Sequence, residues 1–215
     1  IGVAFEADLA SALVIEGGDV VSRVLGGMDW AIEEGAHILS MSLGFRGWWE
    51  DFVPILAILR ARNILPVIAV GNEGAGTSRS PGNYVEVLSI GAINRNLQVP
   101  LFSSSQLFDR PDPLVPDLVA PGEDVISAAP GRGYQSMDGT SMATPHIAGL
   151  AALLWQAKPD AGAAAIEQAI FGSCSLPPGV ATDRGHRGMP DGAAAFTALT
   201  GLPVTRKRVS VAVRK

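Results

Sequence analysis

Several residue types are scarce in this chain, and each shortage argues against a class of function. A single cysteine, Cys174, excludes an intrachain disulfide, and no His-x-x-x-His, Cys-x-x-Cys or EF-hand spacing offers a metal site. No apolar run reaches the length that spans a bilayer. Only 16 Lys and Arg stand against 21 Asp and Glu, a net charge of −5 that argues against the clustered cations of a nucleic-acid binder. The sequence therefore predicts neither a membrane partner nor a nucleic-acid partner.

Apolar residues are abundant, at 47% of 215 positions, which is enough for one sizeable core and one domain. We expect this domain to cover residues 1–205. Residues 206–215 concentrate basic side chains between valines and are predicted to form a tail, a linker or a solvated edge strand. Cys174 lies in a stretch without charged residues, which predicts an inert thiol.

Strand and helix patterns alternate along the chain, and most strand patterns are continuous apolar runs. Such runs are typical of a parallel sheet that is covered on both faces. Asp160 and Asp191 are predicted to cap two Ala-rich helices. We predict strands over residues 9–15, 37–42, 65–70, 87–92, 118–122 and 124–129, and helices over 19–33, 48–62 and 140–158.

Residues 139–149 read Gly-Thr-Ser-Met-Ala-Thr-Pro-His-Ile-Ala-Gly, which places Ser141 where a loop enters an apolar helix. Gly139 lets the backbone approach a ligand closely. The N–H groups of Ser141 and Met142 belong to the first helical turn, which has no intrahelical acceptors for them, so they can stabilise negative charge near the serine oxygen. Ser141 is therefore the predicted nucleophile.

The same string resembles the nucleophile motif of the subtilisin-like serine proteases, the subtilases (peptidase family S8). Residues 1–10 resemble the segment that follows the catalytic-histidine helix in that family, with Phe5 in place of a proline. The resemblance implies an α/β subtilisin-like fold, a parallel sheet flanked by helices on both faces, whose N-terminal elements are missing from this chain. It also implies a serine endopeptidase that forms an acyl-enzyme on Ser141 and acts on peptides or proteins. A secreted or extracytoplasmic location rests on the resemblance alone.

Serine catalysis of this kind needs a histidine base and a carboxylate, and in subtilases both precede the serine. Neither the Asp-Thr/Ser-Gly segment nor the His-Gly-Thr-His segment of the family occurs here. His37 leads into a buried strand, His146 lies in the helix of the serine, and His186 follows the serine in a Gly-rich stretch. We therefore expect the C-terminal part of a catalytic domain, inactive alone and active with an N-terminal fragment that carries His and Asp.

A second motif, Ala-Val-Gly-Asn-Glu-Gly over residues 69–74, ends a predicted strand, where ligands gather in open α/β sheets. By resemblance, the side-chain amide of Asn72 donates to the oxyanion of the tetrahedral intermediate. Without Ser141, the motif would read equally well as an Asn-Glu-Gly turn.

The resemblance also implies a substrate-binding edge and a pocket for the residue before the scissile bond. The edge pairs with an extended peptide through backbone hydrogen bonds, and the pocket supplies selectivity. Glu73 is expected near the rim of this pocket, and Phe45 is expected to narrow the neighbouring subsite. The residues assigned to substrate binding are Ser42, Leu43, Gly44, Ala69, Val70 and Gly71.

Arg79 follows Asn72 after a short loop, close to where relatives form the floor of that pocket. An inward guanidinium would favour an acidic or small side chain before the scissile bond. Because arginine is rarely buried without a partner, the favoured expectation is that Arg79 points outward and leaves a preference for large apolar residues.

Two other functions are compatible with parts of this pattern. A non-catalytic peptide-binding module would keep the substrate edge without needing His or Asp. A serine esterase would need Asp160 and His186 as partners of the serine, and it lacks the Gly-x-Ser-x-Gly motif. No cofactor is required by the predicted reaction. Calcium binds some subtilases, but no calcium site is predicted here.

Overall fold

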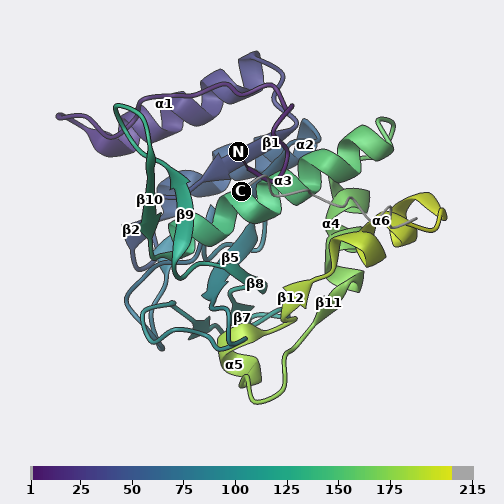
Figure 1. Ribbon diagram of the computed structural model, residues 1–215. Coiled ribbons are helices and arrows are strands. Elements are labelled where there is room, and N and C mark those ends of the chain that lie inside the picture. The colour runs from purple at the N-terminus through teal and green to yellow at the C-terminus, as the bar shows by residue number, and fades with distance from the viewer. Residues whose placement is uncertain (1, 205–215) are drawn as a thin grey trace.

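The computed structural model describes residues 2–204, and its centre is a parallel sheet with the strand order β1, β3, β5, β8 (Figure 1). Met41 lies opposite Ile68, Ala69 opposite Ile90 and Ile93 opposite Pro121. The carboxyl ends of the strands therefore meet at one end of the sheet. The strands are β1 Ile38–Met41, β3 Leu65–Ala69, β5 Leu88–Ile93 and β8 Leu118–Pro121.

The inner strands are buried on both faces. Every residue of β3 and β5 is buried, as their continuous apolar sequences predict. Leu65 and Val67 of β3 pack into one apolar cluster, whereas Ile68 packs into a second. Since successive side chains of a strand point to opposite faces, the two clusters are the two cores of one sheet.

Helices cover both faces, which confirms the predicted α/β class. Helix α3, Thr140–Ala157, contacts all four strands on one face. Helices α4, Ala163–Gly172, and α6, Gly192–Thr200, pack beside it. The other face is covered by α1, Val20–Glu33, and α2, Val53–Ala61, which follows the 3-10 helix η1, Glu50–Phe52. No helix within residues 2–204 is long and apolar enough to cross a bilayer.

Side-chain caps explain where several helices begin. Asp19 accepts hydrogen bonds from the N–H groups of Val21 and Ser22, and Asp191 accepts one from the N–H group of Ala194. The predicted cap at Asp160 is wrong. The first turn of α4 is capped by a residue distant in the sequence, since Asn63 Oδ1 accepts from the Ala163 N–H at 2.7 Å. A short helix, α5, Thr182–Gly185, follows later in the chain.

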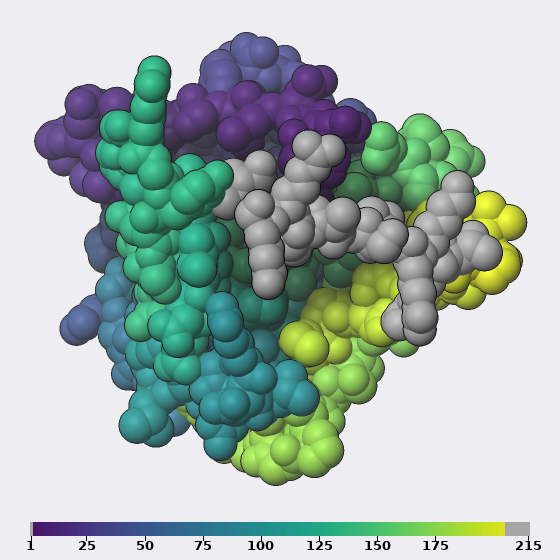
Figure 2. All heavy atoms as spheres, viewed as in Figure 1, coloured from purple at the N-terminus to yellow at the C-terminus, as the bar shows by residue number. Residues whose placement is uncertain are grey.

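Short antiparallel pairs surround the sheet. The β9–β10 hairpin stands out as a ridge of exposed residues that reaches toward the N-terminal segment (Figure 2). Its second strand was not predicted from the sequence. The pairs are β2 Phe45–Arg46 with β4 Arg79–Ser80, β6 Gln106–Leu107 with β7 Leu114–Val115, β9 Val125–Ala128 with β10 Tyr134–Met137, and β11 Cys174–Ser175 with β12 Met189–Pro190.

The two edges of the main sheet differ. On the outer side of β8, the Val119 N–H donates to the Gly188 carbonyl at 3.0 Å, and the Arg187 N–H donates to the Asp117 carbonyl at 3.3 Å. The outer side of β1 has no paired strand among residues 2–204. One edge is therefore covered by the chain itself and the other is open.

The predicted strand over residues 9–15 is wrong. This segment is extended but pairs with no strand among the described residues, and the side chains of Leu9 and Leu13 are 93% and 72% exposed. It runs beside α1, where Val14 packs so closely that a Cβ on Gly27 would lie 2.6 Å from Val14 Cγ1. A helix offers no free backbone groups along its side, so the segment has nothing to pair with there. The predicted tail over 206–215 lies outside the described residues.

Leu154→Ala tests the packing of α3 on the sheet. Leu154 is 1% exposed, and its replacement leaves a cavity, so we expect a loss of about 2–5 kcal/mol in the free energy of unfolding. Leu153→Ala, on the neighbouring position of the same helix, is the matched control, because Leu153 is 41% exposed. Chemical denaturation of both variants measures the difference, and equal losses would contradict the assigned packing face.

Candidate active site

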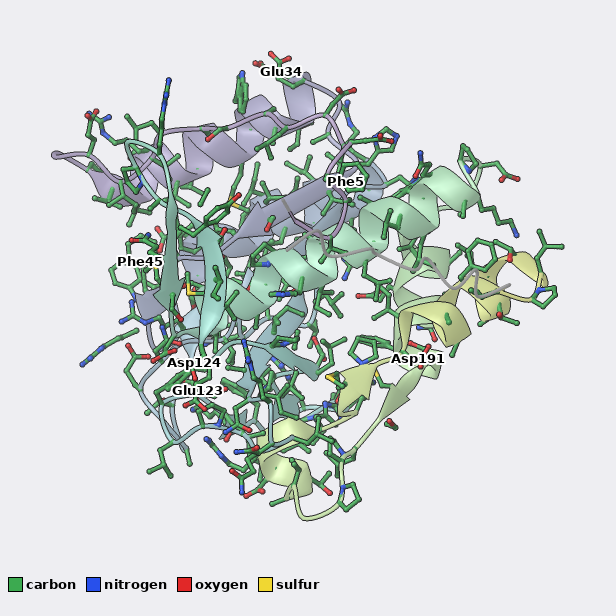
Figure 3. The ribbon with its side chains drawn as sticks, in the orientation of Figure 1. Phe5, Glu34, Phe45, Glu123, Asp124 and Asp191 are labelled. Atoms are coloured by element: carbon green, nitrogen blue, oxygen red, sulfur yellow. The ribbon has the colours of Figure 1, made fainter. Side chains whose placement is uncertain are left out.

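The start of α3 presents Ser141 at the carboxyl end of the sheet. Gly139 adopts φ +151°, a conformation that favours glycine, and its N–H donates to the Gly122 carbonyl at 2.8 Å. This bond ties the start of α3 to the loop after β8. Nearby, Asp138 Oδ1 accepts from the N–H of Asp124, the residue that precedes the first strand of the hairpin and is labelled in Figure 3.

Ser141 and Ser42 exchange two hydrogen bonds. Ser141 Oγ donates to the Ser42 carbonyl at 3.1 Å, and Ser42 Oγ donates to the Ser141 carbonyl at 2.9 Å. Ser42 directly follows β1, so these bonds join the predicted nucleophile to the predicted substrate edge. A carbonyl oxygen accepts a hydrogen bond but cannot serve as a base at neutral pH, so the hydroxyl is positioned without being activated.

Thr140 orients Asn72. The Thr140 N–H donates to Asn72 Oδ1 at 2.9 Å, and the buried Thr140 hydroxyl lies 2.9 Å from the same oxygen. With its oxygen held in this way, Asn72 turns its Nδ2 toward Gly139, where a Cβ would lie 3.3 Å away. Neither Asn72 Nδ2 nor the Ser141 N–H has an acceptor among residues 2–204. The Ser141 nitrogen would lie 3.6 Å from the same Cβ, so these two free donors meet beside Gly139.

A cavity of about 280 Å³ opens beside Ser141. Five of the six predicted substrate-binding residues line it, but Val70 does not, because it is fully buried in the sheet. Phe45, labelled in Figure 3, does not line this cavity, and its ring stacks on that of Phe52 with 5.5 Å between ring centroids, so the expectation that it narrows the neighbouring subsite stays a prediction. The lining residues are Ser42, Leu43, Gly44, Ala69, Gly71, Asn72, Glu73, Arg79, Thr140 and Ser141.

Arg79 lies in the wall of this cavity, so the favoured expectation that it points outward is wrong. Its Nε donates to Glu73 Oε1 at 2.9 Å and its Nη1 donates to the Gly44 carbonyl at 2.6 Å. The hydrogen bond from Arg79 lowers the pKa of Glu73, and the same bond raises the pKa of Arg79. Burial is acceptable for this arginine because Glu73 compensates its charge.

The contacts of the three histidines are with residues other than Ser141. His37 packs edge-on against Trp155 at 5.3 Å between ring centroids, and His146 Nδ1 lies 2.8 Å from the carbonyl of Met142. His186 Nδ1 lies 3.0 Å from a guanidinium nitrogen of Arg187, and its pKa is lowered by burial and by that cation.

The esterase arrangement also lacks its acid. Asp160 follows the far end of α3, and at a rise of 1.5 Å per residue the helix separates that end from Ser141 by about 25 Å.

Within residues 2–204, no group of His, Cys, Asp and Glu side chains is arranged to hold a metal. Burial raises the pKa of Cys174 to about 11, which agrees with an inert thiol.

Sequence reasoning overlooked Thr140, whose position next to Ser141 and after Gly139 was the available signal. It assigned Thr140 only to the start of a helix, whereas the structure uses both of its polar groups to hold Asn72.

The sequence model of the Subtilase family matches residues 1–192. An intracellular serine protease of Paenibacillus polymyxa is 41% identical over 163 residues, which cover 73% of this chain and 48% of that protein. Alkaline elastase YaB of Bacillus sp. (strain YaB) is 38% identical over 74% of this chain and 41% of its own length. Subtilisin Savinase of Lederbergia lenta is 37% identical over 74% of this chain and 57% of its own length. The chain spans about half the length of the curated relatives that it matches.

Solved structures share the fold. The patellamide maturation protease PatA superposes with a TM-score of 0.73 at 27% identity, covering 84% of this chain and 69% of that one. The self-cleaved protease domain of PatA superposes with a TM-score of 0.73 at 26% identity, covering 86% of this chain and 69% of that one. The prenylagaramide maturation protease PagA gives a TM-score of 0.75 at 22% identity, with coverage of 87% and 72%, which supports the fold alone.

Titration of Glu73 tests the ion pair in the cavity wall. Because its pKa is lowered from the ordinary 4.5, Glu73 stays ionised to lower pH, and its stabilising contribution is present above 4.5 and lost as pH falls through the lowered pKa. We expect a carboxyl ¹³C NMR midpoint below 4.5 in this chain and a higher midpoint in Arg79→Met. Arg46→Met is the control, since Arg46 is 79% exposed and lies 3.7 Å from Glu73. An unchanged midpoint in Arg79→Met would contradict the pairing.

Proposed function

Because this chain belongs to the subtilase family of serine proteases, we propose that it hydrolyses peptide bonds in peptide or protein substrates through an acyl-enzyme on Ser141. The observation that carries the proposal is the pair of free donors, Asn72 Nδ2 and the Ser141 N–H, beside the serine hydroxyl. A binding module would have no use for donors fixed at that position.

In the proposed reaction, Ser141 Oγ attacks the carbonyl carbon of the scissile peptide bond while a base removes the hydroxyl proton. The carbonyl oxygen gains a negative charge, which the two donors stabilise. When the C–N bond breaks, the protonated base returns its proton to the leaving amine. Water then attacks the acyl-enzyme by the same steps and releases the second product.

The base and the carboxylate come, in this proposal, from a segment of the protease outside this chain. Its support is that Ser141 Oγ donates only to a carbonyl, while all three histidines are engaged elsewhere. Additional strands could pair with the open edge of β1 and pack against the exposed apolar side chains of the extended segment 9–15. We call this chain, together with the segment that carries the histidine and the carboxylate, the assembled protease.

Labelling by a fluorophosphonate probe tests the nucleophile. We expect Ser141 to react in the assembled protease and to stay unlabelled in the isolated chain, because its hydroxyl then lacks a base. Ser141→Ala should abolish labelling, whereas Ser127→Ala, which removes the hydroxyl of an exposed serine in β9, should retain it.

Two outcomes of that experiment would contradict the proposal. An assembled protease that is not labelled would favour a non-catalytic peptide-binding module. Strong labelling of the isolated chain that disappears in His186→Ala would favour the esterase.

Asn72→Ala tests the oxyanion donor. The donor acts on charge that develops only in the transition state, so kcat should fall while KM changes little. Removal of such a donor in subtilisin lowers kcat by about 10²–10³, and we expect a loss of that order here. Steady-state hydrolysis of a chromogenic peptide by the assembled protease measures both constants. Asn96→Ala, at an exposed loop position, is the control. A change confined to KM would refute the assignment.

A further inference from the structure

The ion pair between Glu73 and Arg79 places two charged side chains in the wall of the cavity beside Ser141. Both side chains line the cavity and both are largely shielded, with 18% and 33% of their side-chain surfaces exposed. Arg46 lies 3.7 Å from the same Glu73 carboxylate but is 79% exposed.

The two partners differ in the hydrogen-bonding capacity that remains to them. Glu73 Oε1 accepts from Nε and Nη2 of Arg79, and Oε2 accepts from the Asn72 N–H at 3.1 Å. Both carboxylate oxygens are therefore engaged. A guanidinium has five N–H donors, and Arg79 uses three of its own, the third on the Gly44 carbonyl. The remaining two have no acceptor among residues 2–204.

The guanidinium is held in place by its surroundings. The backbone N–H of Arg79 donates to the Val70 carbonyl at 2.9 Å, and the backbone of Arg79 pairs with that of Arg46 in the β2–β4 ladder. Gly71, at φ +124°, makes room for the stem, since a Cβ there would lie 3.2 Å from Arg79 Cγ and 2.9 Å from Glu73 Oε2. The unused donors therefore belong to a rigid group, which reduces the entropy lost when a ligand binds.

We propose that Arg79 makes this site select substrates with a hydrogen-bond-accepting side chain, a carboxylate first and an amide second, at the residue before the scissile bond. The inference rests on the proposed peptidase function, because an acyl group on Ser141 places its own side chain next to this cavity. A carboxylate matches the unused donors, because they belong to a cationic guanidinium and their hydrogen bonds to a carboxylate are charge-assisted.

Other side chains fit this wall less well. A Lys or Arg side chain brings a like charge to Arg79, and Oε1 of Glu73 already accepts two hydrogen bonds from that guanidinium. A large apolar side chain covers the unused N–H groups of Arg79 and leaves them without water, and an unsatisfied buried donor is costly.

Cleavage of a mixed peptide library by the assembled protease tests the inference. We expect kcat/KM for peptides with Glu or Asp before the scissile bond to exceed that for Phe, Leu or Lys by at least about ten-fold, as charge-assisted hydrogen bonds allow. Arg79→Met, which keeps the length of the side chain and removes the charge, should abolish this preference. Arg46→Met removes a charge of the same sign outside the cavity and should change the ratio by less than about three-fold. Identical profiles for the unmodified protease and Arg79→Met would overturn the inference.

A binding measurement separates this inference from the proposed function. N-acetylated tripeptide amides that end in Glu or Phe can be titrated into the isolated chain while the Arg79 Nε–H resonance is followed by NMR. We expect the Glu peptide to shift this resonance and to bind at least about ten-fold more tightly than the Phe peptide, with the difference lost in Arg79→Met. Equal binding would overturn the selectivity. If no peptide is cleaved in any arm, the peptidase proposal fails, and the NMR titration alone decides the role of Arg79.

Discussion

The hydrogen bonds between Asn72 and Thr140 connect two parts of the chain on which the site depends. Asn72 follows β3 and Thr140 begins α3, and the two residues are 68 positions apart in sequence. Their contact ties the first residue of α3, which precedes Ser141, to the loop after β3. It also leaves one end of the Asn72 amide free, because the other end is occupied. The same contact thus joins the segments that carry the proposed nucleophile and the proposed oxyanion donor.

The remaining parts of the site come from neighbouring strand ends. Ser42 follows β1 and forms two hydrogen bonds with Ser141. The Gly44 carbonyl accepts a hydrogen bond from the guanidinium of Arg79. Because the strands are parallel and adjacent, groups at their carboxyl ends converge without long loops. The cavity forms between these ends.

The sequence predicted elements well wherever the determining information is local. Buried runs such as those of β3 and β5 need only their own apolar residues, and Asp19 and Asp191 cap helices that start directly after them. The proposed nucleophile and the proposed oxyanion donor could be named because their motifs are contiguous.

Features that depend on distant partners could not be predicted. Residues 9–15 form a strand only if another strand lies beside them to pair with, and the local sequence does not contain that information. The cap of α4 comes from Asn63, which is 100 positions away from Ala163. The placement of Arg79 depends on Glu73 reaching back across the turn between them, and the general rarity of buried arginine pointed the other way. In each case the deciding contact links residues whose proximity only the folded chain creates.

The unequal edges of the sheet have a consequence for self-association of the isolated chain. An exposed strand edge is a template for pairing with a second molecule. Here β8 is covered by the backbone near Gly188, and β1 is the edge that remains open among the described residues. Two copies joined edge to edge through β1 would use up both templates in a closed, two-fold arrangement. Edge pairing through β1 would therefore end at a dimer and would not continue into a fibre.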